Sequence, residues 1–144
     1  MEQSAMLAPA AVLITWTMIM AVWLNVDRMR GLSRANIKPE DFKTGARGSD
    51  LAEIAPEMRD WPAHNYNHLL EQPTVFYAAS VILALTGATV IDSRLAWAYV
   101  VLRILHSLWQ ATINTLRMRS TLFSISSLVM IVLAIRALLA TLGA

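Results

Sequence analysis

The chain lacks cysteine and has few charges, and each shortage limits what it can be. None of its 144 residues is cysteine, which excludes disulfide bonds, thiolate metal sites and a sulfur nucleophile of its own. Any thiol chemistry must therefore use the thiol of a ligand. Charged residues make up only 15% of the chain and hydrophobic residues 56%, an apolar share above that of soluble domains. The composition predicts a small membrane protein.

Long runs with little charge predict a single all-α membrane domain. About 20 apolar residues are enough for a helix to cross the hydrocarbon core of a bilayer. We expect spans at about residues 5–27, 62–90, 94–116 and 120–142, with one hydrophilic loop at about residues 28–60. The predicted fold is therefore an integral membrane four-helix bundle.

The basic residues predict the orientation of this bundle. Seven Lys and Arg residues lie between Arg28 and Arg59, and Arg117 and Arg119 lie between the last two predicted spans. Because cytoplasmic loops carry an excess of Lys and Arg, we expect both connections on the cytoplasmic side and both termini on the other side. The expected location is a bacterial inner membrane. The net charge is only +2, which gives no reason to expect nucleic acid as a partner.

Two charges, Glu71 and Arg103, interrupt predicted spans. A charged side chain at the centre of a bilayer costs about 2.5–3.5 kcal/mol on insertion scales, so it is rarely there without a partner or a role. We expect Glu71 to meet either Arg103 or the ammonium group of a ligand. Pro73 follows Glu71 closely and predicts a kink in the second span.

Polar side chains form one stripe on each of the two middle spans. At 100° per residue, one face of the third span carries Tyr99, Arg103, His106, Ser107, Gln110, Asn114 and Arg117. One face of the second span carries His64, Asn67, His68, Glu71 and Thr74. Single polar residues in membrane helices usually make interhelical hydrogen bonds, and packing remains the alternative. We interpret the stripes as the lining of a cavity that opens toward the cytoplasm and closes partway through the bilayer.

Three other features of the chain are interpreted as structural. Ser124 and Ser127 of the fourth span indicate a packing seam of small residues. Arg136, near the end of that span, is expected to reach the headgroups on the far side. The histidines are a poor metal set, because His64 and His68 would need a third ligand from another helix. No metal site is predicted.

The order of the motifs resembles the MAPEG superfamily, the membrane-associated proteins of eicosanoid and glutathione metabolism. The resemblance covers nearly the whole chain. Its carriers are Arg28-Met29-Arg30, Pro39-Glu40-Asp41, Asn65-Tyr66-Asn67-His68-Leu69-Leu70-Glu71-Gln72-Pro73, Arg103-Ile104-Leu105-His106 and Arg119-Ser120. The resemblance implies a subunit of four helices that assembles as a homotrimer, with glutathione held between neighbouring subunits near the cytoplasmic side.

The resemblance also implies roles for individual residues. Arg28, Arg103 and Arg119 would meet the carboxylates of glutathione, and Glu71 its ammonium group. Arg119 or Ser120 would stabilise the thiolate, since a neighbouring guanidinium lowers the pKa of a thiol; these two are the expected catalytic residues. The remaining expected glutathione-binding residues are Asp41, His64, Asn67, His68, His106, Gln110 and Arg117.

The chain departs from the family pattern at two positions, and the departures keep other functions open. His68 stands where family enzymes usually carry Asn, and Gln110 stands where the prostaglandin-synthesising branch carries Tyr. Gln can donate a hydrogen bond but cannot act as a phenol. The first hypothesis is a glutathione transferase or peroxidase that acts on lipophilic electrophiles or lipid hydroperoxides. The second is a catalytically weak scaffold or accessory subunit of a membrane complex. The third is a small transporter with Glu71 as its proton carrier.

Overall fold

The computed structural model describes residues 3–143, and within them the chain is helical and has no β-strand. Its α-helices are α1 (Gln3–Arg34), α2 (Leu51–Ile54), α3 (Trp61–Leu69), α4 (Gln72–Thr86), α5 (Val90–Thr112) and α6 (Leu116–Leu142). Two short 3-10 helices, η1 (Pro39–Asp41) and η2 (Gly48–Asp50), lie in the long loop.

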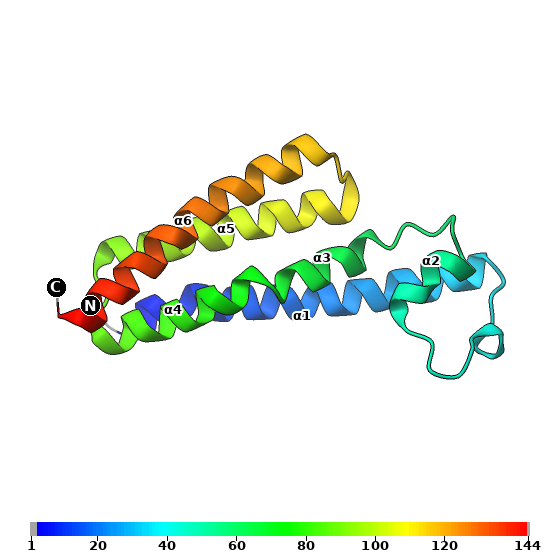
Figure 1. Cartoon of the computed structure of the whole chain (residues 1–144), viewed down its shortest axis with the longest axis horizontal. Helices are drawn as coiled ribbons and strands as arrows, with labels where there is room; N and C mark the ends of the chain where they lie inside the picture. Colours follow the sequence, from blue (N-terminus) through cyan, green and yellow to red (C-terminus); the bar gives the residue numbers. More distant parts are fainter. Residues whose placement is uncertain (1–2, 144) are drawn as a thin grey trace.

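Four rods form the bundle: α1, the pair α3 and α4, α5, and α6 (Figure 1). Helix α5 packs against α1, α3 and α6, whereas α4 packs against α1 and α6. Both ends of the described chain lie at one end of the bundle, and the loop with α2 lies at the other (Figure 1). The predicted all-α membrane bundle is confirmed.

The second rod is broken in the middle. Helix α3 ends at Leu69 and α4 begins at Gln72, and Glu71 between them has the non-helical angles φ −87° and ψ −96°. Pro73 lies in the first turn of α4. A backbone N–H at this position would have no acceptor within the helix, so the N–H that proline lacks is not needed there. The break confirms the kink expected at Pro73, and it places Glu71 outside both helices.

The outside of the bundle is apolar enough for a bilayer. The segments Ser4–Arg34, Trp61–Thr86 and Leu116–Leu142 are long and apolar enough to cross a membrane. Helix α5 has 23 residues and so spans about 34 Å at 1.5 Å per residue, but its inner face is polar, so its crossing remains a prediction. Exposed apolar side chains of α6 include Leu128, Ile131, Ile135, Leu138 and Leu142.

The first helix is longer than the span predicted for it, and the loop folds back onto it. Arg28 therefore lies inside α1 and not at the start of the loop. Its Nε and Nη2 donate to the carboxylate of Asp60 at 3.0 and 2.6 Å. One helical turn further on, the side chain of Met58 packs directly on Gly31, where a Cβ would collide with it. These two contacts fix the end of the loop to α1.

At the opposite end of the bundle, Arg136 pairs with Asp92. Its Nε donates to Oδ1 of Asp92, and its Nη2 donates to Oγ1 of Thr89 at 3.1 Å. Thr89 and Asp92 form the capping box that begins α5. The expectation that Arg136 reaches the headgroups is therefore wrong, because a carboxylate on the neighbouring helix holds its guanidinium.

Candidate functional site

The polar stripe predicted on the third span forms the buried inner face of α5. Tyr99, Arg103, His106, Ser107 and Gln110 are all buried, because this face packs against α1, α3 and α6. The stripe therefore lies inside the bundle, and of these five residues His106 and Gln110 line the cavity described below.

The last two members of the predicted stripe do not belong to it. Helix α5 ends at Thr112, and Asn114 adopts a left-handed conformation with φ 55°, which turns the chain toward α6. Arg117 lies in the first turn of α6 and is exposed. The helical spacing failed here because the chain turns before it reaches these residues.

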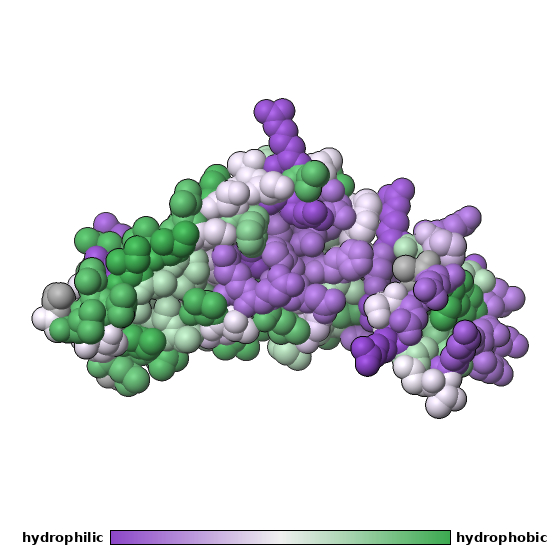
Figure 2. All heavy atoms as spheres, viewed as in Figure 1, coloured by the Kyte–Doolittle hydropathy of each residue, from purple (hydrophilic) through white to green (hydrophobic). Residues whose placement is uncertain are grey.

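A cavity of about 360 Å³ lies between α3, α5 and α6 at the loop end of the bundle. This volume is at the small end of the range of about 300–1,000 Å³ typical of ligand sites. Its lining consists of His64, His68, Glu71, His106, Gln110, Arg119, Ser120, Phe123 and Ser124. We call it the polar cavity. Figure 2 shows hydrophilic atoms gathered over the middle of this face, between α3 and the α5–α6 connection.

Arg103 lies behind the polar cavity and is the least satisfied group in its neighbourhood. The residue is completely buried, and its Nη2 donates to the carbonyl oxygen of His68 at 3.0 Å. Its Nε and Nη1 have no hydrogen-bond partner among the described residues. The guanidinium carbon lies 5.8 Å from the centroid of the Phe123 ring, which offers weak cation–π attraction but no counter-charge. An anion is the partner that such a buried cation needs.

Three rings enclose the space next to this guanidinium. The ring of His68 lies 5.2 Å from that of His106 and 5.1 Å from that of Phe123, between centroids. Nδ1 of His68 is 2.7 Å from Oε2 of Glu71, whereas Nδ1 of His106 is buried without a partner. The expected contact of Glu71 with Arg103 does not form in this structure, because the nearby imidazole takes the carboxylate.

The mouth of the polar cavity is formed by the first turns of α6. Arg119 lines it, and its Nη1 donates to Oδ1 of Asn114 at 2.9 Å. Ser120 and Ser124 are exposed in the same wall. Ser124 was assigned to a packing seam, but in the structure only Ser127 has such a role, because it accepts a hydrogen bond from Gln72 Nε2 at 2.9 Å.

Three of the predicted glutathione-binding residues line a neighbouring cavity. Arg28 and Asn67 line a second space of about 360 Å³, between α1, the loop and α3, together with His64, which also lines the polar cavity. Within one chain Arg28 is thus paired with Asp60 and does not line the polar cavity, which Arg119 does. The structure brings His64 to both cavities.

Asp41 is also outside the polar cavity. It is exposed in η1, and its Oδ2 accepts a hydrogen bond from the backbone N–H of Lys38 at 2.7 Å. In this subunit its carboxylate therefore caps a turn of the loop.

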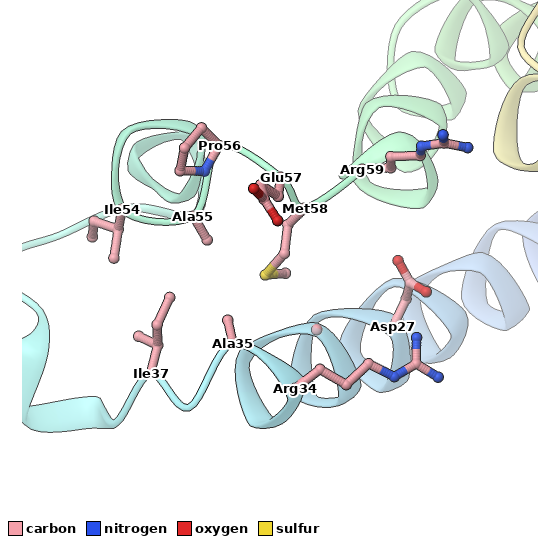
Figure 3. A pocket seen from close by; sticks show the side chains of 11 residues that line it. Asp27, Arg34, Ala35, Ile37, Ile54, Ala55, Pro56, Glu57, Met58 and Arg59 are labelled. Atoms are coloured by element: carbon pink, nitrogen blue, oxygen red, sulfur yellow. The ribbon is translucent and has the colours of Figure 1, made fainter.

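A larger cavity of about 770 Å³ lies at the end of α1. Figure 3 shows Ile54 to Arg59 passing over α1, with the Met58 side chain pointing into the gap. Asp27 and Arg34 contribute charges from α1. None of the predicted site residues lines this space, whereas most of those predicted on the second and third spans line the smaller polar cavity.

Sequence reasoning missed several residues that shape the site. Phe123 lies three residues after Ser120 on the same face of α6, a spacing that could have revealed it. Below the cavity, Ser107 accepts hydrogen bonds from Asn65 Nδ2 at 2.6 Å and from Trp16 Nε1 at 2.9 Å. Nothing in the local sequence of Trp16 indicates a polar partner on α5.

Comparisons with known proteins agree with this geometry. The model of the MAPEG family matches residues 6–139. Searches of curated proteins and of solved structures gave no match. The family match spans every helix of the bundle and all the residues of the polar cavity.

Proposed function

The chain belongs to the MAPEG family, and from this premise we propose that it is a glutathione-dependent membrane enzyme. It would conjugate the glutathione thiolate to lipophilic electrophiles, or reduce lipid hydroperoxides, taken from the bilayer. The family is one of membrane proteins of glutathione and eicosanoid metabolism, which fits the apolar exterior and the polar cavity.

The observation that carries the proposal is the buried guanidinium of Arg103 with two unpartnered donor atoms. Hydrogen bonds between Arg and a carboxylate are charge-assisted and about twice as strong as neutral ones. Arg119, at the mouth of the polar cavity, supplies a second guanidinium. Glutathione carries two carboxylates and a thiol, so two cations at different depths suit its charge distribution.

The remaining groups of glutathione also find partners in the lining. Oε1 of Glu71 makes no hydrogen bond among the described residues, and it is free to accept one from the ligand ammonium group. The Ser120 hydroxyl can donate to the thiolate, and the Arg119 guanidinium beside it stabilises negative charge on sulfur. Because the chain has no cysteine, the nucleophilic sulfur must come from the ligand.

We further propose that the working form is a homotrimer in the bacterial inner membrane, with both termini on the non-cytoplasmic side. In one chain the polar cavity has walls from α3, α5 and α6 only, and the Glu71 side chain is 66% exposed. A charge facing lipid at this depth is costly. A neighbouring subunit would close the open side and could bring its own Arg28 or Asp41 to the cavity.

Turnover by the purified protein tests the proposal. We expect glutathione-dependent conjugation of chlorodinitrobenzene or reduction of a lipid hydroperoxide, and a strong loss of rate in Arg119→Ala. Arg94→Ala is the matched control, because Arg94 is exposed in the first turn of α5 and lines none of the cavities described above. No turnover of either probe by the wild-type protein would contradict an enzymatic function.

One observation favours a second candidate function. Gln110 lines the polar cavity where one branch of the family has a phenol, and its Oε1 is buried without a partner. A chain that binds glutathione without turning it over would be a scaffold or accessory subunit. Binding without activity on either probe is the result that selects this alternative.

A further inference from the structure

We propose that His68 is the general base that deprotonates the glutathione thiol, with Glu71 as its positioning residue. This inference rests on the proposed function and adds a proton acceptor to it. We start from one hydrogen-bonded pair. His68 stands where the family usually carries Asn, and its ring bonds to the side chain of Glu71, three residues later.

The geometry of the pair fixes which ring nitrogen can act. Nδ1 of His68 lies 2.7 Å from Oε2 of Glu71. An ionised carboxylate can only accept hydrogen bonds, so Nδ1 carries the proton and Nε2 of the neutral ring carries the lone pair. Nε2 makes no hydrogen bond among the described residues, and the side chain is 24% exposed. The basic nitrogen is therefore free to accept a proton from a ligand in the polar cavity.

The other histidines of the polar cavity lack this arrangement. His106 lines the same space, but its Nδ1 is buried without a partner. His64 makes no ion pair with a carboxylate in the described part of the chain. A base oriented by a carboxylate is the recurring arrangement for activating a nucleophile, and within this cavity only His68 has it.

The reaction balances without a further reagent. The S–H bond breaks, its electron pair stays on sulfur and the proton moves to Nε2, while Glu71 stabilises the imidazolium. Sulfur then forms a bond to an electron-poor carbon of the lipophilic substrate. The displaced electron pair leaves with the departing group or moves onto the adjacent atom of an activated double bond. After addition to a double bond, His68 returns its proton to that adjacent atom. After displacement of a weakly basic group such as chloride, the imidazolium gives its proton to water, and in both cases His68 is neutral again.

Several charged or ionisable groups lie around the ring of His68. Glu71 lies at the break before α4, His64 on α3, Arg103 and His106 on α5, and Arg119 on α6. Of these groups Glu71 is the one that offers the ring a carboxylate, so variants at Glu71 and His106 separate the role of the base from that of its surroundings.

The test compares His68→Asn with the wild-type protein in mild detergent, using glutathione and S-methylglutathione. We expect S-methylglutathione, which has no thiol proton, to bind both proteins within about threefold of the same affinity. On binding glutathione near neutral pH, the wild-type protein should show the ultraviolet absorbance of a thiolate with little proton release to buffer. In His68→Asn, that absorbance should disappear or be accompanied by release of one proton per site. Conjugation should fall by about 10²- to 10⁴-fold, the usual contribution of a general base.

Further variants distinguish a folding defect from the loss of the general base. His68→Gln keeps more of the packing against Phe123 and should behave like His68→Asn. Glu71→Gln should weaken the thiolate signal, whereas Glu53→Gln, an exposed Glu of α2, should not. His106→Asn should keep the thiolate absorbance that His68→Asn loses, because no carboxylate orients the His106 ring.

Two results would overturn the inference, and they have different meanings. If His68→Asn binds glutathione with the same thiolate signal and the same pH dependence as the wild-type protein, His68 is not the base and the proposed function stands. If the wild-type protein binds no glutathione, the proposed function fails and this inference fails with it.

Discussion

Arg103 is a buried cation whose hydrogen-bonding capacity is only partly used within the described part of the chain. Its guanidinium makes one hydrogen bond, to the carbonyl oxygen of His68, and leaves Nε and Nη1 unpartnered. A buried ion without a counter-charge costs several kcal/mol, while a lost hydrogen bond that leaves one carbonyl unsatisfied costs about 1–3 kcal/mol. Because burying the charge costs more than the hydrogen bond contributes, replacing Arg103 by an apolar residue should not destabilise the protein without ligand.

Arg103→Met should therefore melt at the same temperature as the wild-type protein or above it when no ligand is present. Glutathione should raise the melting temperature of the wild-type protein and raise that of the variant much less, because a lost charge-assisted hydrogen bond costs about 1.5–3 kcal/mol, or more than tenfold in affinity. Thermal unfolding followed by circular dichroism measures both. A variant that melts lower yet keeps the full shift with glutathione would show that Arg103 is a structural residue.

At the residue scale, the sequence predicted which side chains share a helix face. It did not predict contacts that depend on the position of another helix or loop. Arg103, His106 and Gln110 were predicted by their spacing, because a continuous helix makes them neighbours. Arg28 was expected beside the other arginines, but Asp60, 32 residues away, holds it. The place at which α5 turns, set by the backbone at Asn114, was not visible either.

At the scale of elements, the loop is held to α1 by few contacts, and Arg28 makes the strongest of them. Its two hydrogen bonds to Asp60 are bidentate, and both side chains are largely shielded, with 26% and 17% exposure. Nη2 of Arg28 also donates to the carbonyl oxygen of Gly48 at 3.5 Å, and Met58 packs on Gly31. The opening of the loop should therefore depend on this ion pair.

Arg28→Ala should make the loop easier to cleave with trypsin at Lys38, Lys43 and Arg47. If the variant loses about 1 kcal/mol of the free energy that holds the loop closed, the population with an open loop becomes roughly fivefold larger. The rate of cleavage follows that population when opening is fast. Limited proteolysis of the protein in detergent gives the rate. Asp60→Asn should accelerate cleavage similarly, and Glu53→Gln is the control, because Glu53 is exposed on α2 and its side chain makes no hydrogen bond among the described residues. Unchanged cleavage of Arg28→Ala would mean that other contacts hold the loop.

The helices themselves were predictable to different degrees. Hydrophobic length identified the membrane segments, and Pro73 indicated the break between α3 and α4. The extension of α1 to Arg34 was missed, because its last turns are polar and depend on the loop that packs on them. The link between α5 and α6 through Asp92 and Arg136 was missed because helix order alone does not align two charges 44 residues apart.

At the scale of the whole molecule, the open side of the polar cavity is the feature that one subunit does not explain. Glu71, Ser120 and Ser124 are exposed there, between helices whose other faces are apolar. Polar groups are not stable facing lipid. We therefore expect a second copy of the chain to cover this face.

Native mass spectrometry in mild detergent should detect a homotrimer. Its stability should fall when the polar face is altered, for example in Ser124→Leu, because the added side chain would crowd the contact with the neighbouring subunit. Ile125→Ala serves as the control, because Ile125 is also exposed on α6 but lies about 100° round the helix axis from Ser124. A monomer or dimer that still binds glutathione would show that the site is complete within one chain.

Binding of glutathione to the purified protein tests the central claim most directly. In an isothermal titration at neutral pH, the wild-type protein should bind glutathione with saturable heat, and Arg94→Ala should bind it equally well. Arg119→Ala should bind at least tenfold more weakly, since it loses a charge-assisted hydrogen bond at the mouth of the polar cavity. Absence of heat with millimolar glutathione, or equal affinity in all three proteins, would contradict the assignment of the polar cavity as a glutathione site.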